Sequence, residues 1–321
     1  MDYLGLDIAK AKFDAHLMTS AGKHAASFAN TPCGFEQLTA WLARQGSSQG
    51  EALHACMEAT GNWGLDLAAF LFAAGSKVSI INPKQIKAFG ESELARNKTD
   101  KLDAALIARF CSAHKPPAWT PPAGEMRELR EMVRRCAALK VNRTQEINRQ
   151  KAGLASPAVA ASIARMLIHI EAELRCVTME IRALIARDDA LRVNFALLSS
   201  IPGIGEVSAA LIMAELPNIA EFTPKALAAF AGLSPQQDDS GPRRRSAGIS
   251  RIGNPALRSA LYMCALTARR HNPRLADFVQ RMVQLKKPNK VILIAVARKL
   301  LVMAHAVVRT QTPFQAAIAT P

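Results

Sequence analysis

Four acidic residues, in three separate stretches of the chain, have the types and positions needed to hold a divalent cation. Asp7 lies in "GLDIAK", Glu58 in "CMEATG", and Asp100 and Asp103 in "RNKTDKLDA". Converging carboxylates raise one another's pKa, and a divalent cation relieves that repulsion. Hard oxygen ligands favour Mg²⁺ or Mn²⁺, and two such ions about 4 Å apart can stabilise both the attacking and the leaving oxygens of phosphoryl transfer. Taken alone, each acid is more simply a capping or surface residue.

A serine in a polar, basic segment is the second candidate for chemistry. Ser240 lies in "GLSPQQDDSGPRRRSAG", just before Arg243, Arg244 and Arg245. A serine hydroxyl becomes a nucleophile when a base or a metal ion activates it, and arginines can orient and neutralise the attacked phosphate. The residues by themselves favour an ordinary turn serine.

The stretch "SSIPGIGEVSAALIMAEL" (199–216) indicates half of a helix-hairpin-helix element. Gly203 and Gly205 allow a tight turn, and the backbone N–H groups at the following helix N-terminus can hold a phosphate without reading a base. The alternative is a turn between two helices that binds no ligand.

The positive charge is concentrated at one end of the chain. Residues 1–110 hold 11 Lys+Arg and 11 Asp+Glu, whereas residues 241–300 hold 14 Lys+Arg and one acid, Asp277, out of a net charge of +15. This asymmetry favours a polyanionic partner, with nucleic acid first, over a merely solvated surface. The predicted phosphate contacts are Arg243, Arg244, Arg245, Arg251 and Arg258 in this region, and Lys84, Lys87, Arg96 and Lys98 beside the acids.

The elements that position the acids follow from local patterns. Alternating or continuous apolar runs predict short strands, and spacing of three and four predicts helices. The resulting order is β-β-β-α-β-α-β-α, a mixed sheet covered by helices. The predicted strands are 2–8, 12–18, 26–30, 53–59 and 77–82, and the predicted helices begin near 31, 60 and 100.

A proline-rich stretch and a helical region follow. "HKPPAWTPPAGE" (114–125) predicts a linker or strap, because proline does not fit a helix interior. The segment 163–184 has apolar residues at strict 4-3-4-3 spacing, which is typical of a coiled-coil seam. The sequence leaves two arrangements undecided: an antiparallel hairpin with residues 126–150 of the same chain, and a coiled coil between chains. From residue 195 onward the pattern is helical.

The remaining composition indicates a cytosolic protein. No stretch of the sequence predicts a signal peptide or a transmembrane span. The cysteines show no metal-like pairing and are expected to be reduced, small hydrophobic residues; the seven histidines show no ligand spacing. The six cysteines are Cys33, Cys56, Cys111, Cys136, Cys176 and Cys264.

The acidic set on this element order resembles the RuvC-like branch of the ribonuclease H fold. More closely, the chain resembles the DEDD-type transposases of bacterial insertion sequences, which are bridge-RNA-guided serine recombinases. The resemblance runs over nearly the whole chain and is weakest in the helical middle. The motifs that carry it are "GLDIAK", "MEATG", "INPKQIKAF", "RNKTDKLDA", "IPGIG", "AAFAGLSPQ" and "DSG".

The resemblance implies three parts: a RuvC-like metal-binding domain (1–115), a linker and coiled-coil dimerisation region (116–192), and a basic helical domain carrying the serine (193–321). It implies that Ser240 attaches covalently to cut DNA and meets the four acids in a composite site formed by two protomers. It also implies a non-coding guide RNA that pairs with donor and target DNA, dimers that form a tetramer at synapsis, and a bacterial cytoplasmic location at the nucleoid.

Two other functions fit parts of the sequence. A metal-dependent, structure-selective endonuclease of the junction-resolvase kind would use water as the nucleophile and leave Ser240 without a role. A non-catalytic RNA-binding scaffold would keep the basic region without a working metal site, but the complete acidic set argues against it.

Overall fold

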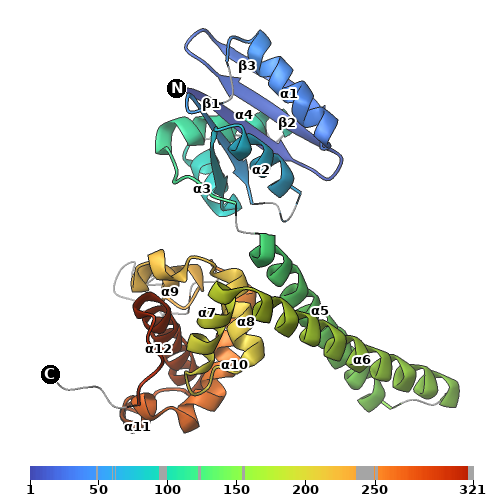
Figure 1. Ribbon diagram of the computed structural model, residues 1–321, viewed down its shortest axis with the longest axis vertical. Helices are drawn as coiled ribbons and strands as arrows, with labels where there is room; N and C mark the ends of the chain where they lie inside the picture. Colours follow the sequence, from blue (N-terminus) through green and yellow to red (C-terminus); the bar gives the residue numbers. More distant parts are fainter. Residues whose placement is uncertain are drawn as a thin grey trace. The chain divides into compact units, whose positions relative to one another are not determined.

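The computed structural model describes residues 1–47, 50–59, 61, 63–93, 100–121, 124–153, 156–235, 249 and 252–316, with only the helical backbone at 100–102. The chain forms two compact units, Met1–Pro121 and Pro122–Pro321 (Figure 1). Each unit is described by itself. The predicted division into three parts stays a prediction.

Unit 1 is built on a five-stranded mixed sheet with the order β3-β2-β1-β4-β5. The first three strands pair antiparallel as a meander, and β4 and β5 continue the sheet parallel to β1. All five predicted strands are confirmed, with shifted ends for the third, fourth and fifth. The strands are β1 (Asp2–Ile8), β2 (Lys12–Met18), β3 (Lys23–Ala29), β4 (Leu53–Glu58) and β5 (Lys77–Ile81).

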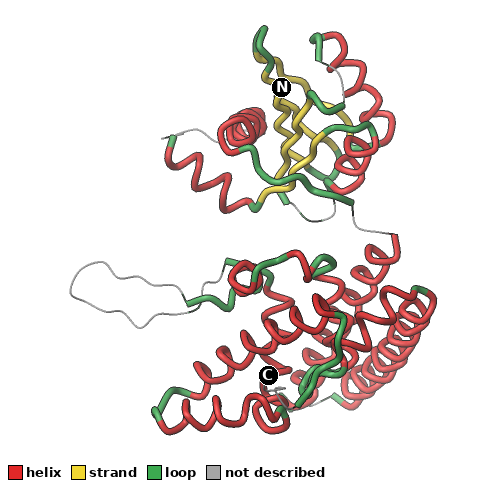
Figure 2. The backbone as a smooth tube through the Cα atoms, turned by 60° about the vertical axis from the view of Figure 1, so that its left-hand side comes forward, coloured by secondary structure: helices red, strands yellow, loops and turns green. Residues whose placement is uncertain are grey.

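Period-two alternation assigns the side chains of β1 to two faces of the sheet. Leu4, Leu6 and Ile8 join a buried cluster with α1 (Pro32–Arg44) and α2 (Leu65–Ala73) on one face. Tyr3, Gly5 and Asp7 therefore belong to the opposite face. Figure 2 shows helices on both sides of the sheet.

The opposite face is covered by α3 (Pro83–Ser92) and α4 (Asp100–His114). The predicted order lacked α3, because Pro83 was interpreted as the end of the preceding strand. The Asn82 side chain instead accepts a hydrogen bond from the Lys84 N–H, and Pro83 occupies the first helical turn, where proline is well tolerated. Arg109 on α4 pairs with Glu93 at the end of α3 at 2.9 Å.

Helix α4 lies directly on the backbone of β1 at Gly5. A Cβ atom at this position would be 2.1 Å from the Ala104 carbonyl oxygen and 2.4 Å from the Ala108 nitrogen. Only glycine fits such a close approach between a strand and a helix. Gly5 therefore fixes both the depth and the axial position of α4 on the sheet.

The predicted proline-rich strap begins directly after α4. Residues 115–121 have no regular structure, and the Trp119 N–H donates to the Val78 carbonyl oxygen on β5 at 2.7 Å. Ser79 Oγ donates to the Pro117 carbonyl oxygen at 2.8 Å. These bonds hold the strap beside β5.

Unit 2 begins with the hairpin of α5 (Gly124–Lys151) and α6 (Pro157–Arg187), which extends away from the other helices of the unit in Figure 1. The two helices pack against each other, and the predicted seam residues Ile163, Ile170 and Ile181 are buried. Of the two alternatives left open by the sequence, the hairpin within one chain is the one observed. A coiled coil between chains stays untested.

The rest of unit 2 is helical, as predicted, and shares one apolar core with the base of the hairpin. By length and composition, one described helix, α12, is able to cross a membrane; it is 56% buried over the relevant window, and a core helix passes the same test. The elements are α7 (Asp189–Ser199), α8 (Glu206–Glu215), η1 (Ile219–Glu221), α9 (Pro224–Phe230), α10 (Pro255–His271), η2 (Pro273–Leu275), α11 (Ala276–Gln284) and α12 (Asn289–Thr310).

A buried carboxylate connects three of these elements. Glu215, 6% exposed at the end of α8, accepts hydrogen bonds from both Arg134 Nε (3.0 Å) and Nη2 (3.3 Å) on α5. Asn254, which caps α10, donates to the same carboxylate at 2.7 Å. Burial opposes ionisation, but the bonds from Arg134 and Asn254 outweigh it, so the pKa of Glu215 lies below its usual value of 4.5.

We expect Gly5→Ala to destabilise unit 1 by about 3 kcal/mol, because the new methyl group must push α4 off the sheet. Gly22→Ala is the matched control: its Cβ would meet only His24 Nε2, at 3.6 Å, so little change is expected. All three tryptophans lie in unit 1, so tryptophan fluorescence during urea unfolding measures the difference. Equal stability of the two variants would contradict the described contact.

We expect Glu215→Gln to destabilise unit 2 by about 2 kcal/mol at pH 7, because the buried carboxylate loses its charge-assisted hydrogen bonds. The Arg134 side chain is half-exposed, so water screens its charge and keeps the cost below that of a fully buried pair. A carboxylate whose folded pKa is lowered stabilises the fold above its unfolded pKa, and that stability disappears as the pH falls through the folded pKa. The difference in the free energy of unfolding between the variant and the wild type should therefore disappear as the pH falls below about 4.5. Far-UV circular dichroism during urea unfolding measures the free energy of unfolding. Glu206→Gln is the control: Glu206 forms an exposed pair with Arg182, so this variant should lose less than about 1 kcal/mol of stability.

Candidate metal and nucleic-acid site

Two of the predicted acids end neighbouring parallel strands. The register pairs Leu6 with Met57, so the next residues, Asp7 and Glu58, are adjacent at the same edge of the sheet. Neighbouring strands lie about 4.8 Å apart, which is a spacing that one cation can bridge. Both side chains are half-buried, and both make interactions within the protein.

The same two acids lie on the face covered by α4. Asp7 is two residues beyond Gly5, and Glu58 is two beyond Cys56, which packs against α4. Period-two alternation therefore directs both side chains to this face.

Helix α4 begins at this edge and runs back along the sheet. Its Ala104 lies over Gly5, whereas its later residue Cys111 donates to the His54 carbonyl oxygen, near the start of β4. Asp103, half-buried, immediately precedes Ala104 and so belongs to the same end of the layer as Asp7. Asp100 begins α4 at this end, and its side chain lies outside the described residues.

The sequence analysis missed one carboxylate. Asp14 on β2 is directly opposite Asp7 in the antiparallel register, and directly opposed residues share a face. It is 4% exposed, and Lys12 Nζ lies 3.1 Å from its Oδ2. A signal was available: Asp14 is the one charged residue inside the run Phe13–Leu17, whose alternation already defined a strand.

The donor set at this edge fits a divalent metal of the magnesium class. It consists of carboxylate oxygens from β1, β4 and α4, with Asp14 beside them, and hard oxygen donors are what Mg²⁺ and Mn²⁺ select. Without an ion, these carboxylates repel one another. The site residues that would hold the metal are thus Asp7, Glu58 and Asp103.

The predicted basic contacts of unit 1 are partly described. Lys84 and Lys87 are exposed on α3, and Lys87 lies 3.9 Å from Glu91, one turn further along the helix. Arg96 and Lys98 lie outside the described residues.

Ser240 and its neighbours Arg243, Arg244, Arg245 and Arg251 also lie outside the described residues. The described ends of their segment are held together. Pro235 and Ile249 form an isolated antiparallel bridge, and the Asn254 N–H donates to the Phe230 carbonyl oxygen at 2.7 Å. Gly253 has φ +144°, and a Cβ there would be 2.5 Å from the Gly232 nitrogen, so this junction depends on glycine.

Arg258 on α10 is close in sequence to this junction. Its Nη1 is buried and has no hydrogen-bond partner among the described residues. Guanidinium groups bind phosphate oxygens strongly, so an unpaired donor here suits an anionic ligand.

The predicted phosphate turn joins α7 to α8, as expected for a helix-hairpin-helix element. Gly203 has φ +105°, and its Cβ position would be 2.4 Å from the Ala268 side chain, so this glycine is required for packing on α10. Gly205 caps α8 without a side-chain bond and faces open space. The next residue, Glu206, pairs with Arg182 at 2.6 Å and opposes a phosphate at this helix end.

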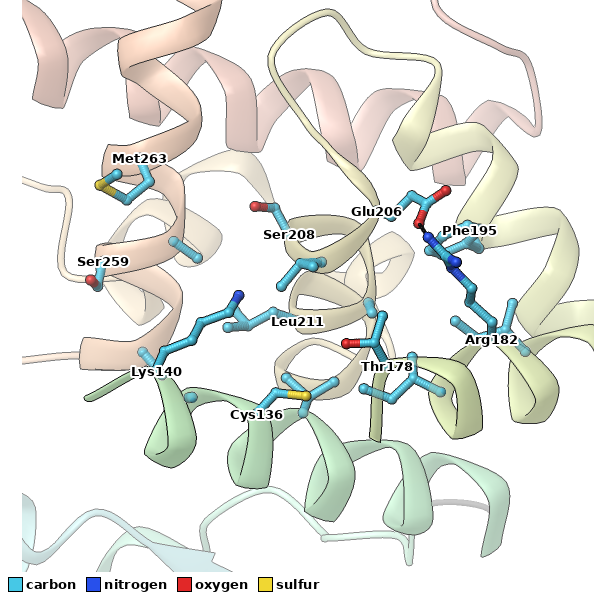
Figure 3. A pocket seen from close by; sticks show the side chains of 18 of the residues that line it. Cys136, Lys140, Thr178, Arg182, Phe195, Glu206, Ser208, Leu211, Ser259 and Met263 are labelled. Carbon is cyan, nitrogen blue, oxygen red and sulfur yellow. Dashed lines mark hydrogen bonds and ion pairs between the residues drawn. The ribbon is translucent and has the colours of Figure 1, made fainter. Parts of the chain in front are cut away.

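A cavity of about 350 Å³ opens among α5, α6, α8 and α10 (Figure 3). Its lining is mainly apolar, with Leu211 and Met263 among the labelled side chains, and the Arg182–Glu206 pair lies at one side. None of the predicted site residues that the structure describes lines it. The cavity therefore adds nothing to the acidic site.

Comparisons with known proteins identify the family. A family model of DEDD transposases of the IS110 type, described as "Transposase", matches residues 4–156, and that of the "Transposase IS116/IS110/IS902 family" matches residues 195–280. The chain is 34% identical to a pilin gene-inverting protein of Moraxella lacunata, over 97% of both chains. It is 27% identical to the transposase for insertion sequence element IS1111A of Coxiella burnetii, over 63% of this chain and 62% of that one. It thus belongs to the IS110-type DEDD transposase family, whose members are enzymes that cleave and rejoin DNA.

Proposed function

We propose that this protein is the transposase of a bacterial insertion sequence, which exchanges DNA strands through a covalent phosphoserine intermediate guided by RNA. The observation that carries the proposal is the gathering of Asp7, Glu58 and the start of α4 at one edge of the sheet. A RuvC-like fold is part of this proposal. The strand order β3-β2-β1-β4-β5, with α4 lying across the sheet, supports this assignment.

The acids of unit 1 hold Mg²⁺ or Mn²⁺ in this proposal: Asp7, Glu58, Asp100 and Asp103. When bound, such ions offset the charge that develops on the phosphate oxygens. The Asp14–Lys12 pair is a positioning element, since it lies beside Asp7 and limits the space in which that carboxylate can turn. Lys84, Lys87, Arg96 and Lys98 hold the substrate strand beside the acids.

Ser240 is the nucleophile. Its oxygen bonds to the DNA phosphorus, and the bond from phosphorus to the leaving deoxyribose oxygen breaks. The serine proton passes to a carboxylate of the acidic set, and the leaving oxygen takes up a proton and departs as a hydroxyl. In the reverse reaction, a deoxyribose hydroxyl of the new partner strand displaces the serine oxygen. Ser240 and the acids that it meets belong to different protomers. Support comes from the family, whose motif "DSG" contains this serine.

The partners follow from charge and from the family. A non-coding guide RNA pairs with donor and target DNA. Unit 2 binds backbone phosphates at the Gly203–Gly205 turn, where Arg182 offsets the charge of Glu206. It also binds them through five arginines: Arg243, Arg244, Arg245, Arg251 and Arg258. The unpaired Nη1 of Arg258 supports this part of the interface.

Dimers form through the α5–α6 hairpin and assemble into a tetramer at synapsis. Since the seam of α6 already packs on α5, the contact between chains uses the exposed residues of the hairpin, such as Ile168 and Met179. The reaction takes place at the bacterial nucleoid.

We expect Asp7→Asn, and equally Asp100→Asn or Asp103→Asn, to lower strand exchange about 100-fold or more, because a metal ligand is lost. RNA binding should be unchanged, since it depends on unit 2. Asp2→Asn, at the other end of the same strand, is the control. Manganese binding by electron paramagnetic resonance and exchange on labelled DNA measure the effect. Full exchange by Asp7→Asn would remove this residue from the site.

We expect Ser240→Ala to abolish the protein–DNA adduct, which a denaturing gel detects as labelled DNA retained on the protein. Metal binding should remain, because the acids are untouched. Ser246→Ala, in the same segment, should keep both the adduct and exchange. Cleavage by Ser240→Ala at the wild-type rate, with no adduct in either protein, would instead favour the endonuclease that uses water.

A further inference from the structure

A second group of possible metal ligands lies in unit 1, away from the acids. His54 and Cys56 on β4 and Cys111 on α4 each offer a donor atom, and the three atoms lie within 4.8 Å of one another. All three side chains are fully buried. Their spacing in the sequence shows no metal-ligand pattern, because residue 111 comes beside 54 and 56 only through the packing of α4.

The hydrogen bonds around His54 determine which ring nitrogen is available. The Ser79 hydroxyl has a single hydrogen, which we assign to the Pro117 carbonyl oxygen at 2.8 Å, with the Pro116 carbonyl oxygen at 3.2 Å. With this assignment the hydroxyl oxygen is the acceptor in its 2.8 Å contact with His54 Nε2. Nε2 therefore carries the proton in the neutral ring. Nδ1 is left with a lone pair, and this buried atom has no hydrogen-bond partner among the described residues.

This arrangement is the one in which histidine usually binds metals. A ligating imidazole donates its other N–H to a fixed second partner, which sets the tautomer and the ring orientation. Ser79, held by the strap, is that partner for His54. An unpaired acceptor in a dry interior is otherwise costly.

We propose that His54 Nδ1 and the thiolates of Cys56 and Cys111 bind one Zn²⁺ ion, as a structural site separate from the catalytic acids.

The charge and the distances suit zinc. Two thiolates and a neutral imidazole cancel the +2 charge of the ion, so no net charge is buried. Ligands at about 2.0–2.3 Å from a tetrahedral ion lie about 3.5–3.8 Å apart, within the 4.8 Å limit found here.

Cysteine binds zinc as the thiolate, so loading the site would release the protons of Cys56 and Cys111.

The site differs from the acidic one in place and in chemistry. Cys111 follows Asp103 by eight residues, or about 12 Å along α4. Its sulfur and imidazole donors select zinc, whereas the carboxylates select magnesium. Zinc would tie the second half of α4 to β4 and, through Ser79, to the strap at 116–117. This proposal does not depend on the proposed recombinase activity.

The test is the metal content of the full-length protein, purified without an affinity tag or chelator from zinc-supplemented cells. Inductively coupled plasma mass spectrometry should find about one zinc ion per wild-type chain. Cys56→Ser and Cys111→Ser should lose it. Cys264→Ser, a buried cysteine of unit 2, and Asp7→Asn should retain it.

A second measurement, on the wild-type protein, tests the proposal even if the cysteine variants fail to fold. Wild-type protein reconstituted with Co²⁺ should show thiolate-to-cobalt charge-transfer absorption that equimolar Zn²⁺ removes. Zinc content well below one per chain together with no such absorption would overturn the proposal. So would a Cys56–Cys111 disulfide in the isolated protein, zinc retained by Cys111→Ser, or stoichiometric copper in place of zinc.

Discussion

The close contact between β1 and α4 at Gly5 is the constraint on which unit 1 depends. A helix normally rests on the side chains of a sheet, but here its backbone reaches the strand itself, with the Ala104 carbonyl oxygen 2.1 Å from where a Cβ would be. Because α4 is fixed at this one point, the positions of all its other residues over the sheet are fixed as well. Its first turns lie at the edge where Asp7 and Glu58 end their strands, and its later turns lie over the start of β4.

Helix α4 thus relates two sets of donors of opposite character. At its start the donors are half-buried carboxylates. Two turns later the donors are thiols and an imidazole in a fully buried position. In the two proposals, the carboxylates would bind ions beside the substrate, and the thiols and imidazole would hold the helix in place. A rigid helix on a glycine contact lets one part of the fold serve both needs.

Unit 2 is organised around a different buried group. The Glu215 carboxylate joins the long hairpin, through Arg134, to Asn254 at the start of α10. Asn254 also lies at the end of the segment that contains Ser240, where Gly253 packs on Gly232. The hairpin and the base of this segment therefore share one hydrogen-bonded carboxylate.

The sequence by itself determined the five strands, the strap, the apolar seam of α6 and the acidic and basic residue types, because each follows from local periodicity or composition. It also carried the family motifs. It did not determine α3. The sequence pattern predicts that Pro83 ends regular structure, but the Asn82 cap begins a helix at this point. Only the tertiary structure decided that the seam closes within one chain, that Asp14 faces Asp7, and that Cys111 meets His54. These contacts depend on strand order and on the direction in which α4 crosses the sheet, and no local pattern of residues encodes either.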